Sequence, residues 1–160
     1  MDIYRTYTEK LNSSQYQLEL YPAKALEEDR QRIQEAGAEI ADRVKKAKEA
    51  GFESTPTSLL EEQIVNTDEE LAAAEKLKEF YEGMEKHYHD TKQVEYEKEM
   101  HDNVQKLISD ISTLNSTKIE FQNSINSKPL EELQTTMQNL ESEASILKGK
   151  LDSLENPNSD

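Results

Sequence analysis

The hydrophobic positions near the end of the chain repeat with alternating spacings of three and four residues. They are Leu130, Leu133, Met137, Leu140, Ala144, Leu147, Leu151 and Leu154. This spacing is the a and d pattern of a helix that packs lengthwise against another helix. The sequence therefore predicts a helix over 130–154 whose apolar stripe is a partner-binding seam.

A second stripe of the same kind lies just before the first. Its members are Met100, Val104, Leu107, Ile111, Leu114, Lys118, Phe121 and Ile125. Ile125 and Leu130 occupy equivalent positions only five residues apart, so an unbroken helix would rotate its stripe by about 140° between them. With Pro129 in the link, the pattern predicts a turn capped by Ser127 that folds 130–154 back antiparallel on 104–125. The alternative is a kinked helix whose stripes meet different partners.

The start of the chain is rich in tyrosine and also follows heptad spacing. The stripe is formed by Tyr4, Tyr7, Leu11, Ser14, Leu18 and Tyr21. It predicts a helix over 3–20 that ends before Pro22, although residues 16–21 also alternate as an extended segment would. Tyrosine is enriched at interface anchors, so the candidate docking residues are Tyr4, Tyr7, Leu11 and Tyr16. The alternative is that these side chains pack on the chain itself.

Two further helices are predicted between these ends. The first begins at Pro22 and ends at Ala50, where Gly51 supplies a left-handed residue. Its stripe comprises Leu26, Ile33, Gly37, Ile40, Val44 and Ala47. The second begins near Ser58 and meets no proline before Pro129. It is predicted to run to about residue 126, with a second capping signal near Asn66 as the alternative break; the polar residues 86–99 are then a narrow neck within it.

The predicted fold is all-α: elongated helical hairpins or a coiled coil, with a long central helix and a shorter helix folded against each end. The segments are a tyrosine-rich helical segment (1–21), a first helix and turn (22–56), the central helix (57–126), a heptad helix (127–155) and a disordered tail (156–160). A two-helix hairpin buries one face of each helix and is marginal alone. A partner chain is therefore expected.

Composition supports long helices rather than a globular core. Hydrophobic residues make up 34% and charged residues 33%, and there are only 4 Gly and 4 Pro, whereas a typical soluble domain is roughly 45–50% apolar. The net charge of −15 opposes binding to nucleic-acid phosphates or an anionic bilayer. The expected partners are therefore helical protein chains, a heteromer rather than a homomer, with no direct nucleic-acid contact and no membrane contact.

The chain offers little for catalysis, metal binding or secretion. It has no cysteine, hence no disulfide framework, and no leader or long apolar run, which predicts a soluble, intracellular protein of cytoplasm or nucleus. His87, His89 and His101 lack the Glu-x-x-His spacing of helical metal sites. Glu85 with His89, and Glu97 with His101, are expected as exposed pairs. No catalytic residue, metal or cofactor is predicted.

Long, acidic, cysteine-free helical chains of this kind resemble the small subunits of heteromeric coiled-coil assemblies. Kinetochore, spindle, vesicle-tethering and coactivator complexes contain such subunits, and the resemblance is one of architecture alone. It implies a non-enzymatic structural subunit of a scaffold or tethering complex. The alternative is an acidic helical chaperone that holds basic or unfolded clients. A membrane-binding helical dimer is disfavoured by the acidic charge.

Overall fold

The computed structural model describes residues 2–155, and over that range the chain is all-α, as predicted. The helices are α1 (Asp2–Glu19), α2 (Tyr21–Glu49), α3 (Thr57–Asp90) and α4 (Val94–Glu155). The chain divides into two units, Met1–Gln122 and Asn123–Asp160, so the boundary falls within α4. The predicted disordered tail, 156–160, lies outside the described residues.

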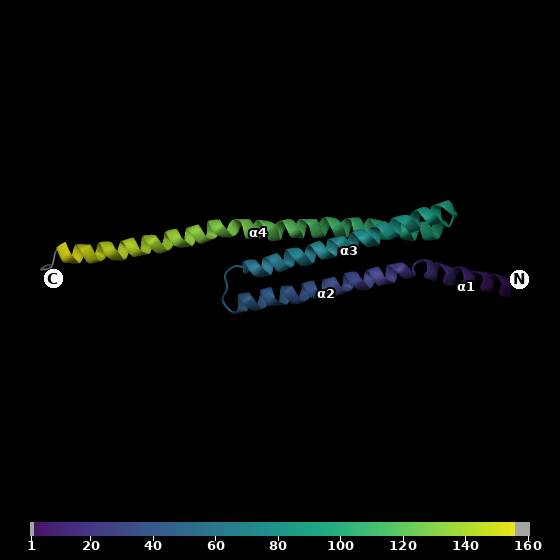
Figure 1. The fold of residues 1–160 in the computed structure, drawn as a ribbon, viewed down its shortest axis with the longest axis horizontal. Helices are drawn as coiled ribbons and strands as arrows, with labels where there is room; N and C mark the ends of the chain where they lie inside the picture. Colours follow the sequence, from purple (N-terminus) through teal and green to yellow (C-terminus); the bar gives the residue numbers. More distant parts are fainter. Residues whose placement is uncertain (1, 156–160) are drawn as a thin grey trace. The chain divides into compact units, whose positions relative to one another are not determined.

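The first unit is a bundle of α2, α3 and the first part of α4, which lie side by side (Figure 1). Its core contains alanine, leucine and tyrosine side chains, together with one methionine and one valine. The buried members are Ala23, Ala74, Leu77, Tyr81, Tyr88, Met100, Val104 and Leu107. Tyr16 and Leu20 pack against them from α1 and the turn that follows it. The bundle therefore closes a core within the chain itself.

The turns around α2 follow from proline and glycine chemistry. α1 ends at Glu19, and Pro22 lies in the first turn of α2, where its missing N–H costs nothing. At the other end, Gly51 adopts φ 101°, and the N–H of Phe52 donates to the carbonyl of Ala47 at 3.1 Å. This 6→1 bond defines a Schellman stop. The predicted helix over 3–20 and the predicted glycine stop are both confirmed.

The predicted central helix over 57–126 is wrong, because α3 ends at Asp90 and α4 begins at Val94. Lys92 adopts a left-handed conformation with φ 59°, and the N–H of Gln93 donates to the carbonyl of Tyr88 at 2.9 Å. The turn is thus another Schellman stop, with lysine where glycine is usual. Residues 86–99 therefore include the hairpin turn at 91–93 and are not a neck within one helix. The alternative break near Asn66 is absent, because α3 continues through that residue.

The predicted turn at 126–129 is also wrong, because Pro129 lies inside α4. Ser127 does not cap a new helix; its hydroxyl donates to the carbonyl of Ser124 at 3.0 Å, within the helix. Proline removes one N–H from the ladder and disfavours an α conformation at the residue before it. It does not forbid continuation, so residues 127–155 are the last part of α4 rather than a separate helix.

Candidate protein-binding surfaces

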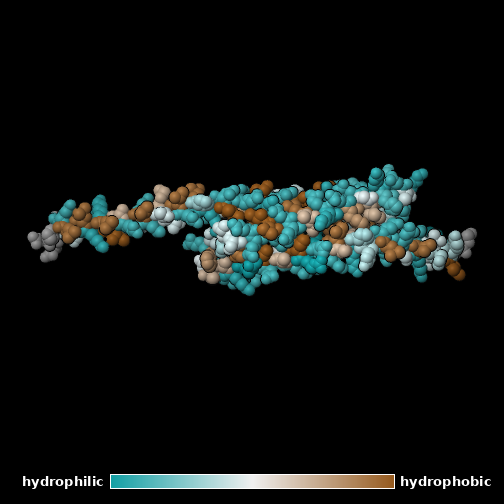
Figure 2. Space-filling view, in the orientation of Figure 1, coloured by the Kyte–Doolittle hydropathy of each residue, from teal (hydrophilic) through white to brown (hydrophobic). Residues whose placement is uncertain are grey.

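The apolar stripe of residues 130–154 is uncovered within its own unit. Its large members are 54–76% exposed, namely Leu130, Leu133, Met137, Leu140, Leu147, Leu151 and Leu154. Every described residue from 129 to 155 is exposed, and Figure 2 shows apolar side chains among hydrophilic neighbours along this segment. The residues form the helix that the heptad pattern predicted, and their seam has no cover within the second unit.

The second predicted stripe has a different environment. Val104 and Leu107 are buried in the core of the first unit, and Ile111 packs against that core. Leu114, Phe121 and Ile125 are half-buried. Val104 and Leu107 therefore belong to the core of the first unit and are not available to a partner.

The tyrosine-rich segment divides into an exposed part and a packed part. Tyr4 is 79% exposed, Tyr7 is 65% exposed and Leu11 is 55% exposed. Tyr16, in contrast, stacks on Tyr96 of α4 with ring centroids 3.9 Å apart and an angle of 11° between the planes. Leu18 and Tyr21 of the same predicted stripe are also exposed, at 73% and 69%. Tyr16 thus fixes the last part of α1 to the bundle, while the large apolar members of the stripe itself stay uncovered.

Tyr88 is the buried centre of the contact between α1 and the α3–α4 hairpin. Its side chain is fully buried, and its hydroxyl donates to Oε2 of Glu19 at 2.7 Å. Burial and this hydrogen bond to a carboxylate raise the pKa of Tyr88 above its usual range. The hydroxyl of Tyr16 likewise donates to Glu99. Tyr16 and Tyr88 are therefore structural, since the hydroxyl of each is engaged with a glutamate.

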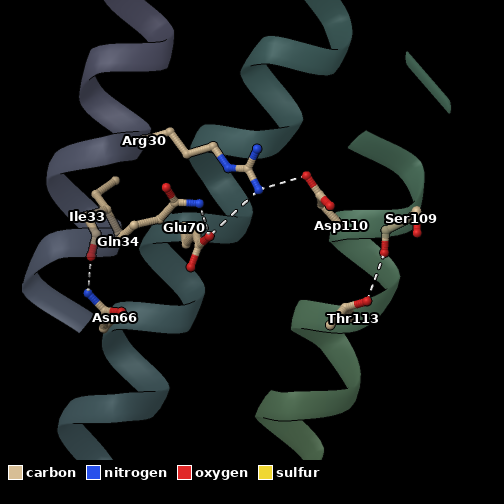
Figure 3. A network of polar contacts seen from close by, with 8 residues as sticks. All are labelled: Arg30, Ile33, Gln34, Asn66, Glu70, Ser109, Asp110 and Thr113. Atoms are coloured by element: carbon tan, nitrogen blue, oxygen red, sulfur yellow. Dashed lines mark hydrogen bonds and ion pairs between the residues drawn. The ribbon is translucent and has the colours of Figure 1, made fainter. Parts of the chain in front are cut away.

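Polar contacts join the helices of the bundle in one narrow layer (Figure 3). The guanidinium of Arg30 on α2 lies 3.7 Å from Glu70 of α3 and 3.0 Å from Asp110 of α4. Arg30 continues the three–four spacing between Leu26 and Ile33, so a charged residue at a seam position was the signal that sequence reasoning missed. A shifted register would leave this largely buried charge unpaired, so the layer fixes the alignment of the bundle.

Lys118 is the corresponding charged residue of the second stripe. Its Nζ lies 2.7 Å from Oδ1 of Asp68 on α3, within the first unit. A polar group at a seam position sets register in helical assemblies. Lys118 therefore aligns α4 with α3 inside the chain.

Two of the three histidines, His89 and His101, make pairs that cross the α3–α4 hairpin. Nδ1 of His89 lies 2.9 Å from Glu97, and Nδ1 of His101 lies 2.8 Å from Glu85. The sequence predicted the opposite pairing, four residues apart on one helix, because it placed no turn at 91–93. Within residues 2–155 no group of three His, Cys, Asp or Glu side chains is arranged to hold a metal ion.

A groove on the bundle surface lies between α2 and α3 and involves neither stripe. It encloses about 500 Å³ and is lined in part by Leu26, Ile33, Ala36, Ala72 and Ala73. Small residues on both helices leave this space, since alanine fills little of the gap between neighbouring helices. The groove is open and carries charged residues at its rim, including Asp29 and Arg32.

The sequence matches no family model, no curated protein and no solved structure. None of the helices in residues 2–155 combines the length and apolarity that crossing a membrane requires.

Proposed function

We propose that this chain is a non-enzymatic structural subunit that assembles with other helical chains in a heteromeric scaffold or tethering complex. The observation that carries the proposal is the seam of residues 130–154, in which apolar residues at a and d spacing are more than half exposed. An apolar stripe of this length and regularity marks an interaction site on a protein surface.

Helix energetics supports a partner for this segment. A helix of this length without tertiary contacts is marginal in water, since most helical stability in proteins comes from packing of an apolar face. Burying each seam leucine contributes roughly 1.5–3 kcal/mol relative to leaving it exposed. A second helix laid along the seam would therefore stabilise both the helix and the assembly.

The exposed stripe of α1 supports the same reading. Tyr4, Tyr7 and Leu11 extend beyond the packed part of α1, and each is more than half exposed. Tyrosine supplies large contact area at low entropic cost, which suits a second docking surface. A chain that closes its own bundle and leaves stripes uncovered is equipped to join other chains.

The proposal is tested by crosslinking and capture with the full chain as bait. Leu140→Asp and Leu147→Asp each place a carboxylate on the seam and should reduce capture of the partner by about 100-fold or more, because a buried unpaired carboxylate costs several kcal/mol. Ser142→Asp adds the same charge on the opposite face of the helix and should capture as the unmodified chain does.

One result of this capture experiment would contradict the proposed function. If the two leucine variants recover the same partner in the same amount as Ser142→Asp, the seam is a solvated helix face and the proposed function fails. The thermal transition of the bundle, measured on the same samples, should be unchanged in every variant because none of these residues lies in the first unit.

A further inference from the structure

The charges that flank the seam indicate which chain covers it. In the heptad register that places Leu130 and Leu151 at a, the g positions include Glu143 and Lys150. The e positions include Lys148 and Glu155. Residues at e and g border the seam of a coiled coil and set partner choice and orientation.

A second copy of this chain, parallel and in register, satisfies these charges. In such a pair each g residue faces the e residue of the next heptad on the other helix. Glu143 then faces Lys148 of the second copy, and Lys150 faces Glu155 of the second copy. Two-fold symmetry repeats both pairs. No like-charged e and g residues meet in this arrangement, and every a and d residue of the seam meets its own counterpart.

Antiparallel pairing of the same seam is less favourable. The antiparallel register that covers the whole stripe sets Leu130 opposite Leu154 of the second copy. It also brings Glu141 against Glu141 and Glu143 against Glu143 at the two-fold axis, since antiparallel helices pair e with e and g with g. A shift by one heptad separates these glutamates but leaves two leucines at one end of the stripe, either Leu130 and Leu133 or Leu151 and Leu154, without an apolar residue opposite.

We infer that the seam of residues 130–154 is covered by a second copy of this chain, in a parallel, in-register coiled-coil dimer. This inference rests on the proposed function, because it takes the stripe of residues 130–154 to be a partner-binding seam. It adds that the partner at this seam is a second copy of the chain. At this seam the inference names a second copy where the sequence favoured a different chain, because the flanking charges are complementary to themselves. Other helical chains then bind the dimer that this seam holds together.

Reciprocal charge reversal tests the pairing. The acidic variant carries Lys148→Glu with Lys150→Glu, and the basic variant carries Glu143→Lys with Glu155→Lys. Each alone sets only like charges across the seam and should dimerise about 30-fold more weakly than the unmodified chain, since each exposed pair contributes little and their effects combine. Mixed in equal amounts, the two variants should form a mixed dimer at least as tight as the unmodified one.

A matched control and the oligomeric state complete the test. Lys24→Glu with Lys45→Glu changes the net charge as the acidic variant does, but away from the seam, and should leave dimerisation unchanged. Light scattering should give twice the 18.4 kDa mass of one chain at about 100 µM, where an affinity of about 10 µM leaves most chains dimeric. A chain of monomeric mass at that concentration overturns the inference.

Orientation is read from single cysteines, because the chain has none of its own. Leu154→Cys should form a disulfide with a second Leu154→Cys chain under mild oxidation, as should Leu130→Cys with itself, since like positions face one another in register. Crosslinking of Leu130→Cys only to Leu154→Cys overturns the parallel arrangement. A monomeric chain whose Leu140→Asp variant still loses a captured partner overturns the dimer while leaving the proposed function standing.

Discussion

At the scale of single residues, Gly37 shows how α2 and α3 approach one another. A Cβ added at Gly37 would lie 2.5 Å from Oδ1 of Asn66. The Asn66 side chain cannot swing away freely, because its Nδ2 donates to the carbonyl of Ile33 at 2.9 Å. Glycine is thus required at this position by a side chain that bridges the two helices.

Gly37→Ala should be at least about 1 kcal/mol less stable than Gly83→Ala. Alanine at Gly83 meets nothing within 4 Å and should stabilise its helix by about 0.5–1 kcal/mol through lower chain entropy. Alanine at Gly37 gains the same entropy but displaces Asn66 from its hydrogen bond, which costs about 1 kcal/mol. Urea unfolding of both variants measures the difference. Equal stabilisation would mean that α2 and α3 do not approach closely there.

Tyr88 gives the first unit a defined pH dependence. Its pKa is raised by burial and by the hydrogen bond to Glu19, whereas in the unfolded chain a tyrosine titrates at about 10. The contribution of Tyr88 to stability is therefore complete below about pH 10 and is lost at higher pH, where the unfolded state releases its proton first.

Tyr88→Phe should accordingly flatten the alkaline loss of stability. The unmodified chain should lose more thermal stability from about pH 9 to about pH 11 than Tyr88→Phe does, as followed by circular dichroism. Tyr4→Phe removes a hydroxyl from a residue that is 79% exposed and should behave as the unmodified chain. A Tyr88→Phe profile that coincides with that of Tyr4→Phe would place the Tyr88 hydroxyl outside the core.

At the scale of elements, the sequence predicts one of the two Schellman stops, at Gly51, but not the other, at Lys92. The stop at Gly51 is predictable because glycine adopts a left-handed conformation without steric cost. The stop at Lys92 has the same pattern of hydrogen bonds, but it lacks the glycine that would have predicted it. It forms because the apolar stripes of α3 and α4 bury one another, which outweighs the local preference of a lysine. Single-residue signals do not carry such tertiary information.

Lys92→Gly should therefore stabilise the first unit by about 1 kcal/mol, because a left-handed non-glycine residue is strained by roughly that amount. Lys86→Gly is the matched control: it removes the same charge from an exposed position inside α3 and should destabilise by about 1 kcal/mol. Both values come from chemical denaturation. If Lys92→Gly destabilises as Lys86→Gly does, the chain has a helix through 91–93 and not a hairpin turn.

Pro129 is the opposite case, because here a local signal predicted a turn that the structure lacks. Proline and a preceding serine are a frequent start of a helix, so a turn was expected. In an exposed helix the cost of proline is limited to its missing N–H and the crowding of one carbonyl. The hydroxyl of Ser127 satisfies a carbonyl one turn earlier, and α4 includes Pro129.

At the scale of the whole molecule, the heptad pattern identified the seams but not their partners. Both stripes of α4 were predicted from spacing alone, yet Val104 and Leu107 are buried within the chain while Leu140 and Leu147 are exposed. The two stripes have similar residues, so periodicity cannot distinguish a core from an interface. The hairpin at 91–93 supplies α3 as the intrachain cover of the first stripe, and spacing alone does not reveal that hairpin.

We propose that another helix covers the seam of residues 130–154. Hydrogen exchange of the full chain, alone at low concentration and within its assembly, tests this proposal most directly. We expect fast exchange of 130–154 in the dilute chain, since an uncovered helix is marginal in water, and strong protection in the assembly, with α3 protected in both. Unchanged exchange of 130–154 on assembly would contradict it.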